Sequence, residues 1–235
     1  MRAPLIGSLT LALAACQGPL STLDPGGPQA QSVFVFTGAM IAAAIVAFTF
    51  VIVLFALALR RGSRSLGKAA TPGSAKGGAP RKDPARRWTL WLGVSFPLTV
   101  LTILLAATLW VGEGQFARDR TLPTWRATAS QWQWRFAAVL PDGSLGPSTT
   151  RLVIPAGQPV IVELAATDVI HSFWVPRLAG KMDAVPGKLN RHLIEAASPG
   201  TYLGVCAEYC GTGHDHMRFE VVAIAPRNAT AGASR

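Results

Sequence analysis

The sequence predicts a membrane-anchored chain of mixed class, in which a transmembrane hairpin of two helices carries an all-β sandwich outside the membrane. Three observations support this fold class. Two long uncharged apolar runs lie in the N-terminal half, and a short, strongly basic stretch separates them. From Gly112 onward the chain changes to short β-branched runs bounded by Pro and Gly, which is the pattern of strands and turns.

The first 32 residues are predicted to contain an export signal and a tether. Residues 1–15 have one basic residue, Arg2, and a short apolar run that cannot span a bilayer. Small residues stand directly before Cys16, which is typical of a bacterial lipoprotein signal. Cys16 is therefore expected to carry lipid; the alternative is an ordinary leader with a chance cysteine. Residues 16–32, rich in Gly, Pro and Ser, are expected to be an extracytoplasmic tether.

Two membrane spans are predicted, at residues 33–59 and 89–111. The first run has 27 residues without a charge, which at about 1.5 Å per residue exceeds the roughly 30 Å hydrocarbon core. The second contains Pro97, which a membrane helix tolerates better than a soluble one, and Trp88 and Trp110 lie near its ends, where aromatic side chains favour the interface. Two buried helices of a globular core are the alternative, but such helices are shorter and rarely free of charge.

Residues 60–88 are expected to form a basic cytoplasmic loop. Nine Lys or Arg and a single acid, Asp83, lie between Arg60 and Arg87, and a positive excess marks the cytoplasmic side, so both chain ends are expected outside. The composition of the loop predicts disorder rather than a specific contact with anionic lipid. From residue 112 to 224 ten basic residues balance ten acidic ones, so the folded domain lacks the basic patch that nucleic-acid binding needs.

Residues 112–225 are expected to form one β domain, since about 110 residues suffice for a single core. Trp125–Leu140 is predicted as extended chain, closed by a turn at residues 141–143. Short strands separated by turn residues indicate a sandwich or a barrel. Residues 226–235 are predicted to be a disordered tail. The other predicted strands are Arg151–Ile154, Val160–Leu164, His192–Ala196, Thr201–Val205 and Arg218–Ala223.

A cluster of metal-ligand residues lies between the last two predicted strands. Cys206, Cys210, His214 and Met217 fall within twelve residues, and His171 lies upstream at the end of another strand. Thiolate, imidazole and thioether together favour copper, because zinc has little use for methionine. A mononuclear copper site of this kind uses one cysteine, whereas two thiolates can bridge two copper ions with one histidine on each. The cysteine pair alone would equally fit a redox disulfide or two buried thiols.

The spacing of these ligands carries a family resemblance. The segment Cys-Ala-Glu-Tyr-Cys-Gly-Thr-Gly-His-Asp-His-Met, residues 206–217, resembles the binuclear copper (CuA) motif of cytochrome c oxidase subunit II. Residues 131–136, 171–176 and 181–188 are similar to three further elements of that family. The resemblance covers residues 33–223. It implies a cupredoxin-like sandwich that accepts single electrons from cytochrome c and passes them to the haems of subunit I, where oxygen is reduced to water.

The resemblance also implies roles for single residues. Glu208 would bind copper weakly through its backbone carbonyl, and its carboxylate would reach a magnesium or manganese ion at the interface with subunit I. Trp132 would be the point of electron entry, although without the family it is simply a core aromatic. Asp168 matches an acidic docking position for cytochrome c, although taken alone it is a turn residue. The implied ligands of the two copper ions are His171, Cys206, Glu208, Cys210, His214 and Met217.

Three other functions remain open at this point. A quinol-oxidase-type subunit II lacks the copper ligands present here, a membrane-anchored copper carrier needs exposed ligands and no second span, and a nitrous oxide reductase has a large further domain. His192 and His216 fit no ligand position and are expected on the surface or on strands, and Met182 in packing. The chain also has no acid at residues 86–92, where the family often carries a glutamate tied to proton uptake.

The expected setting is the inner membrane of a bacterial cell. The expected partners are subunit I and the other oxidase subunits, cytochrome c and membrane lipid, with no nucleic acid. Haem is expected only on the partner subunit. The oxidase as a whole would be an oxidoreductase and proton translocase, whereas this chain by itself holds no complete active site.

Overall fold

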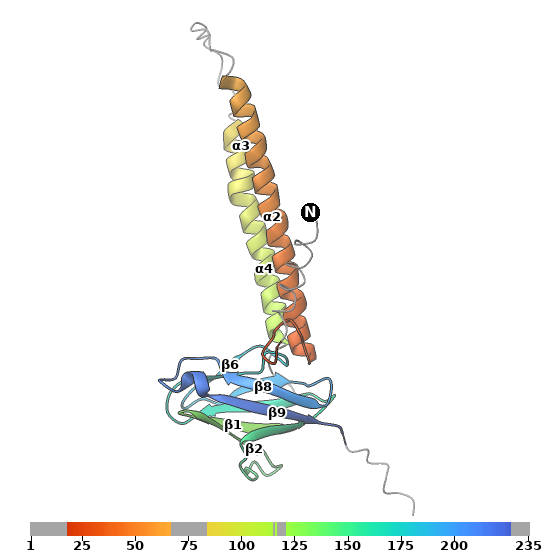
Figure 1. Cartoon of the computed structure of the whole chain (residues 1–235), viewed down its shortest axis with the longest axis vertical. Coiled ribbons are helices and arrows are strands. Elements are labelled where there is room, and N and C mark those ends of the chain that lie inside the picture. Colours follow the sequence, from red (N-terminus) through yellow and green to blue (C-terminus); the bar gives the residue numbers. More distant parts are fainter. Residues whose placement is uncertain (1–17, 67–83, 115, 117–120, 227–235) are drawn as a thin grey trace, which may run out of the picture. The chain divides into compact units, whose positions relative to one another are not determined.

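A computed structural model of the chain describes residues 18–66, 84–114, 116 and 121–226, with the side chains of 62–66, 84 and 85 excepted. The chain forms two compact units, one of Met1–Phe36 with Val111–Arg235 and one of Thr37–Trp110. The predicted signal at 1–15, Cys16, nearly all of the tail at 226–235 and the middle of the predicted loop at 60–88 lie outside the described residues. Figure 1 shows a helical part and a β domain.

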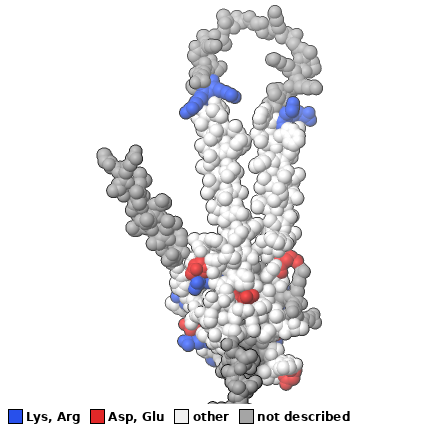
Figure 2. Space-filling model, turned by 90° about the vertical axis from the view of Figure 1, so that its right-hand side faces the viewer, with Lys and Arg blue, Asp and Glu red and all other residues white. Residues whose placement is uncertain are grey.

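Two helices are long and apolar enough to cross a membrane, over Pro28–Arg61 and Arg86–Glu113. The first belongs to α2, Pro28–Leu66, and the second consists of α3, Pro84–Leu90, a π-helix, Trp91–Ser95, and α4, Phe96–Glu113. Both predicted spans lie within these helices, but the helical backbone continues beyond them into flanking polar residues. In Figure 2 the two helices are white along their length, with Lys and Arg at one end of each.

The helix bounds follow from local chemistry. Pro28 stands at the first position of α2, where its missing N–H has no partner in any case, so α2 begins five residues before the predicted span. In the second helix, Pro97 has no N–H for the regular ladder. The π-turn lies directly before it, and the Phe96 N–H donates to the Trp91 carbonyl five residues back. The extra residue in this turn accommodates the proline without breaking the helix.

Polar side chains within the second helix are satisfied by the helix itself. The hydroxyls of Thr99, Thr102 and Thr108 donate to carbonyl oxygens four residues earlier, at 2.9, 2.8 and 2.7 Å. Such bonds remove the cost of an unpaired hydroxyl in hydrocarbon. The three threonines are therefore compatible with a helix that faces lipid.

The β domain is a sandwich of two sheets with strand orders β2-β1-β4-β7 and β3-β9-β8-β5-β6, seen as two layers in Figure 1. The pairs β1–β4 and β3–β9 are parallel and the others antiparallel. This confirms the predicted two-helix plus β-sandwich fold class. The strands are β1 Thr124–Ser130, β2 Gln133–Ala138, β3 Arg151–Pro155, β4 Val160–Ala166, β5 His171–Trp174, β6 Met182–Ala184, β7 Asn190–Ile194, β8 Gly200–Cys206 and β9 Arg218–Ile224.

Aromatic side chains from both sheets meet in the core. Phe173 of β5 stacks on Phe219 of β9 with ring centroids 4.7 Å apart, and Trp134 of β2 reaches across to both of them, at 5.7 and 5.4 Å. Phe136 of β2 contacts Phe219 at 5.6 Å. All four rings are buried. This cluster joins the two layers directly behind the strands that carry the metal-ligand residues.

The sequence prediction differs from the structure at four strands, β1, β2, β5 and β6. The segment 125–140 is not one extended run but the hairpin β1–β2, which turns at residues 131 and 132. The strands β5 and β6 were not predicted. His171 begins β5 instead of ending a strand, because the residues before it form a bend that is held by the Asp168 side chain.

Residues 18–30, here called the N-terminal strap, pack on the β domain rather than hanging free as a tether. The Gly26 N–H donates to the Arg177 carbonyl at 2.6 Å, the Ala30 N–H to the Leu178 carbonyl at 3.0 Å, and the Ala197 N–H to the Gly26 carbonyl at 2.8 Å. The Arg177 guanidinium also pairs with the Asp24 carboxylate at 2.8 Å. The prediction of a tether at 16–32 is therefore wrong for this segment.

Replacing Gly27 with alanine is expected to loosen this strap. A Cβ at Gly27 would overlap the backbone carbonyl oxygen of Glu195, which cannot rotate away. We expect a loss of about 1–3 kcal/mol in the free energy of unfolding, together with faster proteolysis within the strap. Gly18→Ala is the matched control, because a Cβ there meets nothing within 4 Å. An unchanged melting temperature in Gly27→Ala would contradict the packed strap.

Candidate metal centre

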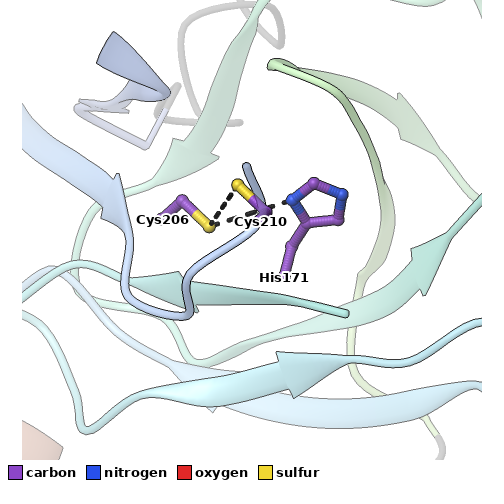
Figure 3. A group of neighbouring side chains, drawn as sticks. All are labelled: His171, Cys206 and Cys210. Carbon is purple, nitrogen blue, oxygen red and sulfur yellow. Dashed lines mark hydrogen bonds between the residues drawn. The ribbon is translucent and has the colours of Figure 1, made fainter. Parts of the chain in front are cut away.

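The order of the second sheet brings the candidate ligands together. β8 ends at Cys206, and the chain returns to β9 through the loop 207–217, which contains a short 3₁₀ helix at His214–His216. β5 lies beside β8 in antiparallel register, with Phe173 opposite Cys206. His171, two residues before Phe173, therefore reaches the start of the loop, and Figure 3 shows its ring pointing toward the two cysteines.

The candidate ligand atoms form one group of contacts. His171 Nδ1 lies 3.9 Å from Cys206 Sγ, which lies 3.9 Å from Cys210 Sγ. On the other side, Cys210 Sγ lies 3.6 Å from His214 Nδ1 and 3.8 Å from Met217 Sδ. The Glu208 carbonyl lies 3.3 Å from Cys206 Sγ. All six predicted ligand residues are thus brought together, with the two sulfurs at the centre and one imidazole on either side.

Cys206 and Cys210 are free thiols, since their Sγ atoms lie 3.9 Å apart and form no disulfide. Cys206 and Cys210 are buried, as are His171 and Met217. Burial, together with the neighbouring Cys206, raises the pKa of the Cys210 thiol to about 11. The donor atoms of His171, Cys206 and Cys210 all lie within 4.8 Å of one another. Thiols held together in a buried pocket with imidazoles at both sides form a site for a soft metal ion.

Asp168 orients the His171 ring from the side opposite the cysteines. Its Oδ1 lies 2.8 Å from His171 Nε2 and accepts the Val169 N–H, while its Oδ2 accepts the Gln131 N–H, both at 2.7 Å. Burial raises the pKa of the Asp168 carboxyl, but these hydrogen bonds outweigh it and hold the pKa below its usual value. With Nε2 engaged by the carboxylate, Nδ1 is left to face the metal site. The predicted docking role of Asp168 stays a prediction.

Trp132 lies at the surface directly over the site. Its side chain is 42% exposed, and its indole N–H donates to the Cys210 carbonyl at 3.3 Å. The ring rests on glycines, since a Cβ at Gly213 would lie 2.5 Å from the Trp132 ring, and Gly211 has φ +121°. Glycine at both positions lets the indole pack flat against the ligand loop. This connection between the surface and a cysteine ligand is compatible with the predicted role in electron entry.

The other residues discussed in the sequence analysis lie in different environments. The Glu208 carboxylate points to the Lys181 ammonium at 3.7 Å. His192 lies on β7 but is buried, with Nε2 3.0 Å from the Gly180 carbonyl, so the surface alternative for it is wrong. His216 is exposed and pairs with Asp215. Met182 packs against the core, as expected.

Two contacts at the site were not predicted from the sequence. The Tyr209 ring meets the His214 ring edge-on, with centroids 5.8 Å apart, and Trp134 meets His171 in the same manner at 6.3 Å. Tyr209 stands between the two cysteines in the sequence, and only this position indicates that it lies near the metal ligands. Trp134 could not be told from any other core aromatic.

Comparison with known proteins agrees with this geometry. Residues 141–224 match the family model described as cytochrome c oxidase subunit II, periplasmic domain. Cytochrome c oxidase subunit 2 of Alkalihalophilus pseudofirmus is 34% identical over 228 residues, which cover 92% of this chain and 62% of that protein. The chain belongs to the cytochrome c oxidase subunit II family.

Further members of the subunit II family show the same relation. Cytochrome c oxidase subunit 2 of Branchiostoma floridae is 31% identical over 154 residues, covering 58% of this chain and 66% of that protein. The solved periplasmic domain of subunit II (CoxB) of Bradyrhizobium japonicum is 30% identical with a TM-score of 0.40, covering 46% of this chain and 86% of that one. The chain spans less than two thirds of the length of the first three relatives, at 62%, 50% and 66%.

Proposed function

We propose that this chain is the electron-accepting subunit II of a cytochrome c oxidase and binds two copper ions at the candidate metal centre. The observation that carries the proposal is the pair of free, buried thiols 3.9 Å apart, with His171 on one side and His214 on the other. Such a set offers two sulfurs that two metal ions can share and one imidazole for each ion. When bound, a binuclear copper centre supplies reversible one-electron oxidation and reduction.

The chemistry of the donor set favours copper over other metals. The two thiols, two imidazoles, the Met217 thioether and the Glu208 carbonyl exceed the four ligands of a zinc site, and the thioether is a ligand that copper accepts. The protein holds these groups on two adjacent strands and one short loop, four of them buried. Such a rigid, dry setting limits the rearrangement that accompanies a change of charge.

Other parts of the chain would provide electron entry, the contact with subunit I and the membrane anchor. Trp132 would receive the electron from cytochrome c, since its indole joins the surface to the Cys210 carbonyl. The haems and the oxygen-reducing site would lie on subunit I, and Glu208 would contribute to a magnesium or manganese site at that interface. The two long apolar helices would span the membrane, with both chain ends outside and the basic loop inside. Lipidation of Cys16 would add a further anchor.

A membrane-anchored copper carrier is the second candidate, and burial of the ligands opposes it. A carrier exchanges its ion with partners and so needs accessible ligands, whereas His171, Cys206, Cys210 and Met217 are buried. A quinol-oxidase-type subunit has no use for these four residues together.

The test is the metal content and paramagnetic resonance of the full chain, purified in detergent and loaded with copper. Two coppers per chain, with one unpaired electron shared by both nuclei, are expected. One copper with the spectrum of an isolated ion, or preferential retention of zinc, would rule out the binuclear centre.

Replacing Asp168 with alanine is expected to weaken copper retention by about 10–100-fold, the usual effect of removing the partner of a ligating histidine. The His171 ring would lose the carboxylate that fixes its orientation. Competition with a copper chelator measures the change. Asp215→Ala is the matched control, because this exposed carboxylate contacts only the exposed His216 among the interactions described for it. Equal retention in both variants would show that Asp168 does not position the ligand.

A further inference from the structure

Four exposed apolar side chains surround the candidate metal centre: Trp132, Val169, Ile170 and Tyr209, here called the apolar docking surface. We propose that this surface holds the electron donor by uncharged contact, and that it fits a c-type cytochrome whose exposed haem edge is surrounded by uncharged side chains. The inference rests on the proposed function, since that function makes a cytochrome the donor. Beyond the proposed function, the inference names the residues that the donor contacts and states that uncharged contacts select the donor.

The four side chains come from three loops that are tied together. The β1–β2 turn joins the loop before β5 through the bond from the Gln131 N–H to the Asp168 carboxylate. The same turn joins the ligand loop through the Gln131 side-chain amide, which donates to the Cys210 carbonyl at 2.8 Å, and through the Trp132 indole. These hydrogen bonds hold the three loops together and preform the surface.

Three of the four residues of the apolar docking surface adjoin a candidate metal ligand. Ile170 directly precedes His171, Tyr209 directly precedes Cys210 and contacts the His214 ring, and Trp132 donates to the Cys210 carbonyl. A protein seated here would thus have its redox group near the metal centre. Tyr209 is the most exposed of the four, at 75%, and stands over His214, whereas Trp132 stands over Cys210. Electron transfer decays steeply with distance, so contact at these residues favours it.

The charges around this surface do not form an acidic docking site. The three loops contain no Lys or Arg and three acids. Asp168 accepts three hydrogen bonds from within the domain, and Glu208 faces the Lys181 ammonium. Only Asp215 lies largely exposed, 3.2 Å from the His216 ring. Steering of a basic partner needs a group of uncompensated charges, whereas exposed Trp and Tyr beside aliphatic side chains are typical of a contact made by burial.

The experiment measures the binding of two c-type cytochromes to the copper-loaded oxidase complex in detergent. One probe has a haem edge ringed by lysines and the other has an uncharged haem edge. We expect the uncharged probe to bind more tightly, with its Kd changing less than about twofold between roughly 20 and roughly 300 mM salt, because screening acts only on charge. Tyr209→Ser and Ile170→Ser are each expected to raise that Kd about tenfold, with an unchanged paramagnetic signal.

Two variants serve as controls. Tyr209→Phe keeps the ring and should bind like the native chain. Leu145→Ser removes a similarly exposed apolar side chain beyond the opposite end of β2, and should also leave the Kd unchanged. Tighter binding of the lysine-ringed probe, with a Kd that rises steeply with salt and ignores Tyr209→Ser, would overturn the apolar docking surface. That result would leave the proposed function standing, whereas a chain without a binuclear copper signal would fail the proposed function itself.

Discussion

Replacing Cys206 with serine is expected to abolish the proposed binuclear copper centre and to lower electron acceptance from cytochrome c by more than about 100-fold, because losing a ligand costs more than the roughly 10–100-fold effect of removing a ligand's hydrogen-bond partner. Cys206 Sγ lies 3.9 Å from His171 Nδ1, 3.3 Å from the Glu208 carbonyl oxygen and 3.9 Å from Cys210 Sγ. A hydroxyl in its place is a poor ligand for copper and cannot be shared between two ions. Copper analysis, paramagnetic resonance and stopped-flow mixing with reduced cytochrome c measure the effect.

Met182→Leu is the matched control for this change. It removes a sulfur from the neighbouring strand β6, where Met182 lies opposite Phe173 and not opposite a candidate ligand, and a swap of similar volume costs less than about 1.5 kcal/mol. Two coppers per chain in Cys206→Ser, with full electron acceptance, would refute the assignment of Cys206.

Replacing Phe173 with alanine is expected to lower the free energy of unfolding by about 3–5 kcal/mol, because the removed ring leaves a cavity in a closely packed core. Phe173 is fully buried and touches both Trp134 and Phe219, so its ring joins the two sheets. It also lies opposite Cys206 in the β5–β8 register. Urea unfolding of the copper-free full chain in detergent, followed by tryptophan fluorescence, measures the loss.

Leu140→Ala controls for the general effect of shortening an apolar side chain. Leu140 is exposed, and a surface change of this kind is usually within about 0.5 kcal/mol of neutral. A loss below about 1 kcal/mol in Phe173→Ala would show that the core closes around the missing ring.

The sequence predicted which residues come together at the candidate metal centre, because five of the six predicted ligands lie in, or directly before, one short loop. Between Cys206 and Met217, residues that are close in the sequence are also close in space, so the sequence alone reveals the cluster. His171 was a candidate only because it is a histidine near a predicted strand end, and its role as a ligand came from the family resemblance, since no local pattern relates it to residues 35 positions later. The inward direction of the Asp168 carboxylate was not predictable for the same reason, because it depends on the Gln131 N–H of a different hairpin.

The fold was predictable where hydrophobic patterning is strong and not where backbone groups make the contacts. The two helices are long uncharged apolar runs, and most strands are short β-branched or alternating runs between turn residues. The short β5 and β6 lack it, and β5 is buried through all but its last residue. The N-terminal strap has the Gly and Pro content of a linker, yet its backbone N–H and C=O groups pair with residues 177, 178 and 197. A hydrogen bond made by backbone leaves no trace in side-chain composition.

The strap has a consequence for how the protein is made. Asp24 precedes both apolar helices and Arg177 follows them, and the side chain of Arg177 bonds across 153 positions to the Asp24 carbonyl. A domain that contains both segments requires both to arrive on the same side of the bilayer, so the chain between them must cross an even number of times. In the proposed membrane topology, the strap can pack on the β domain only after both have reached the outer side of the bilayer. On that topology, insertion of both helices would come before the strap packs against residues 177, 178 and 197 of the β domain.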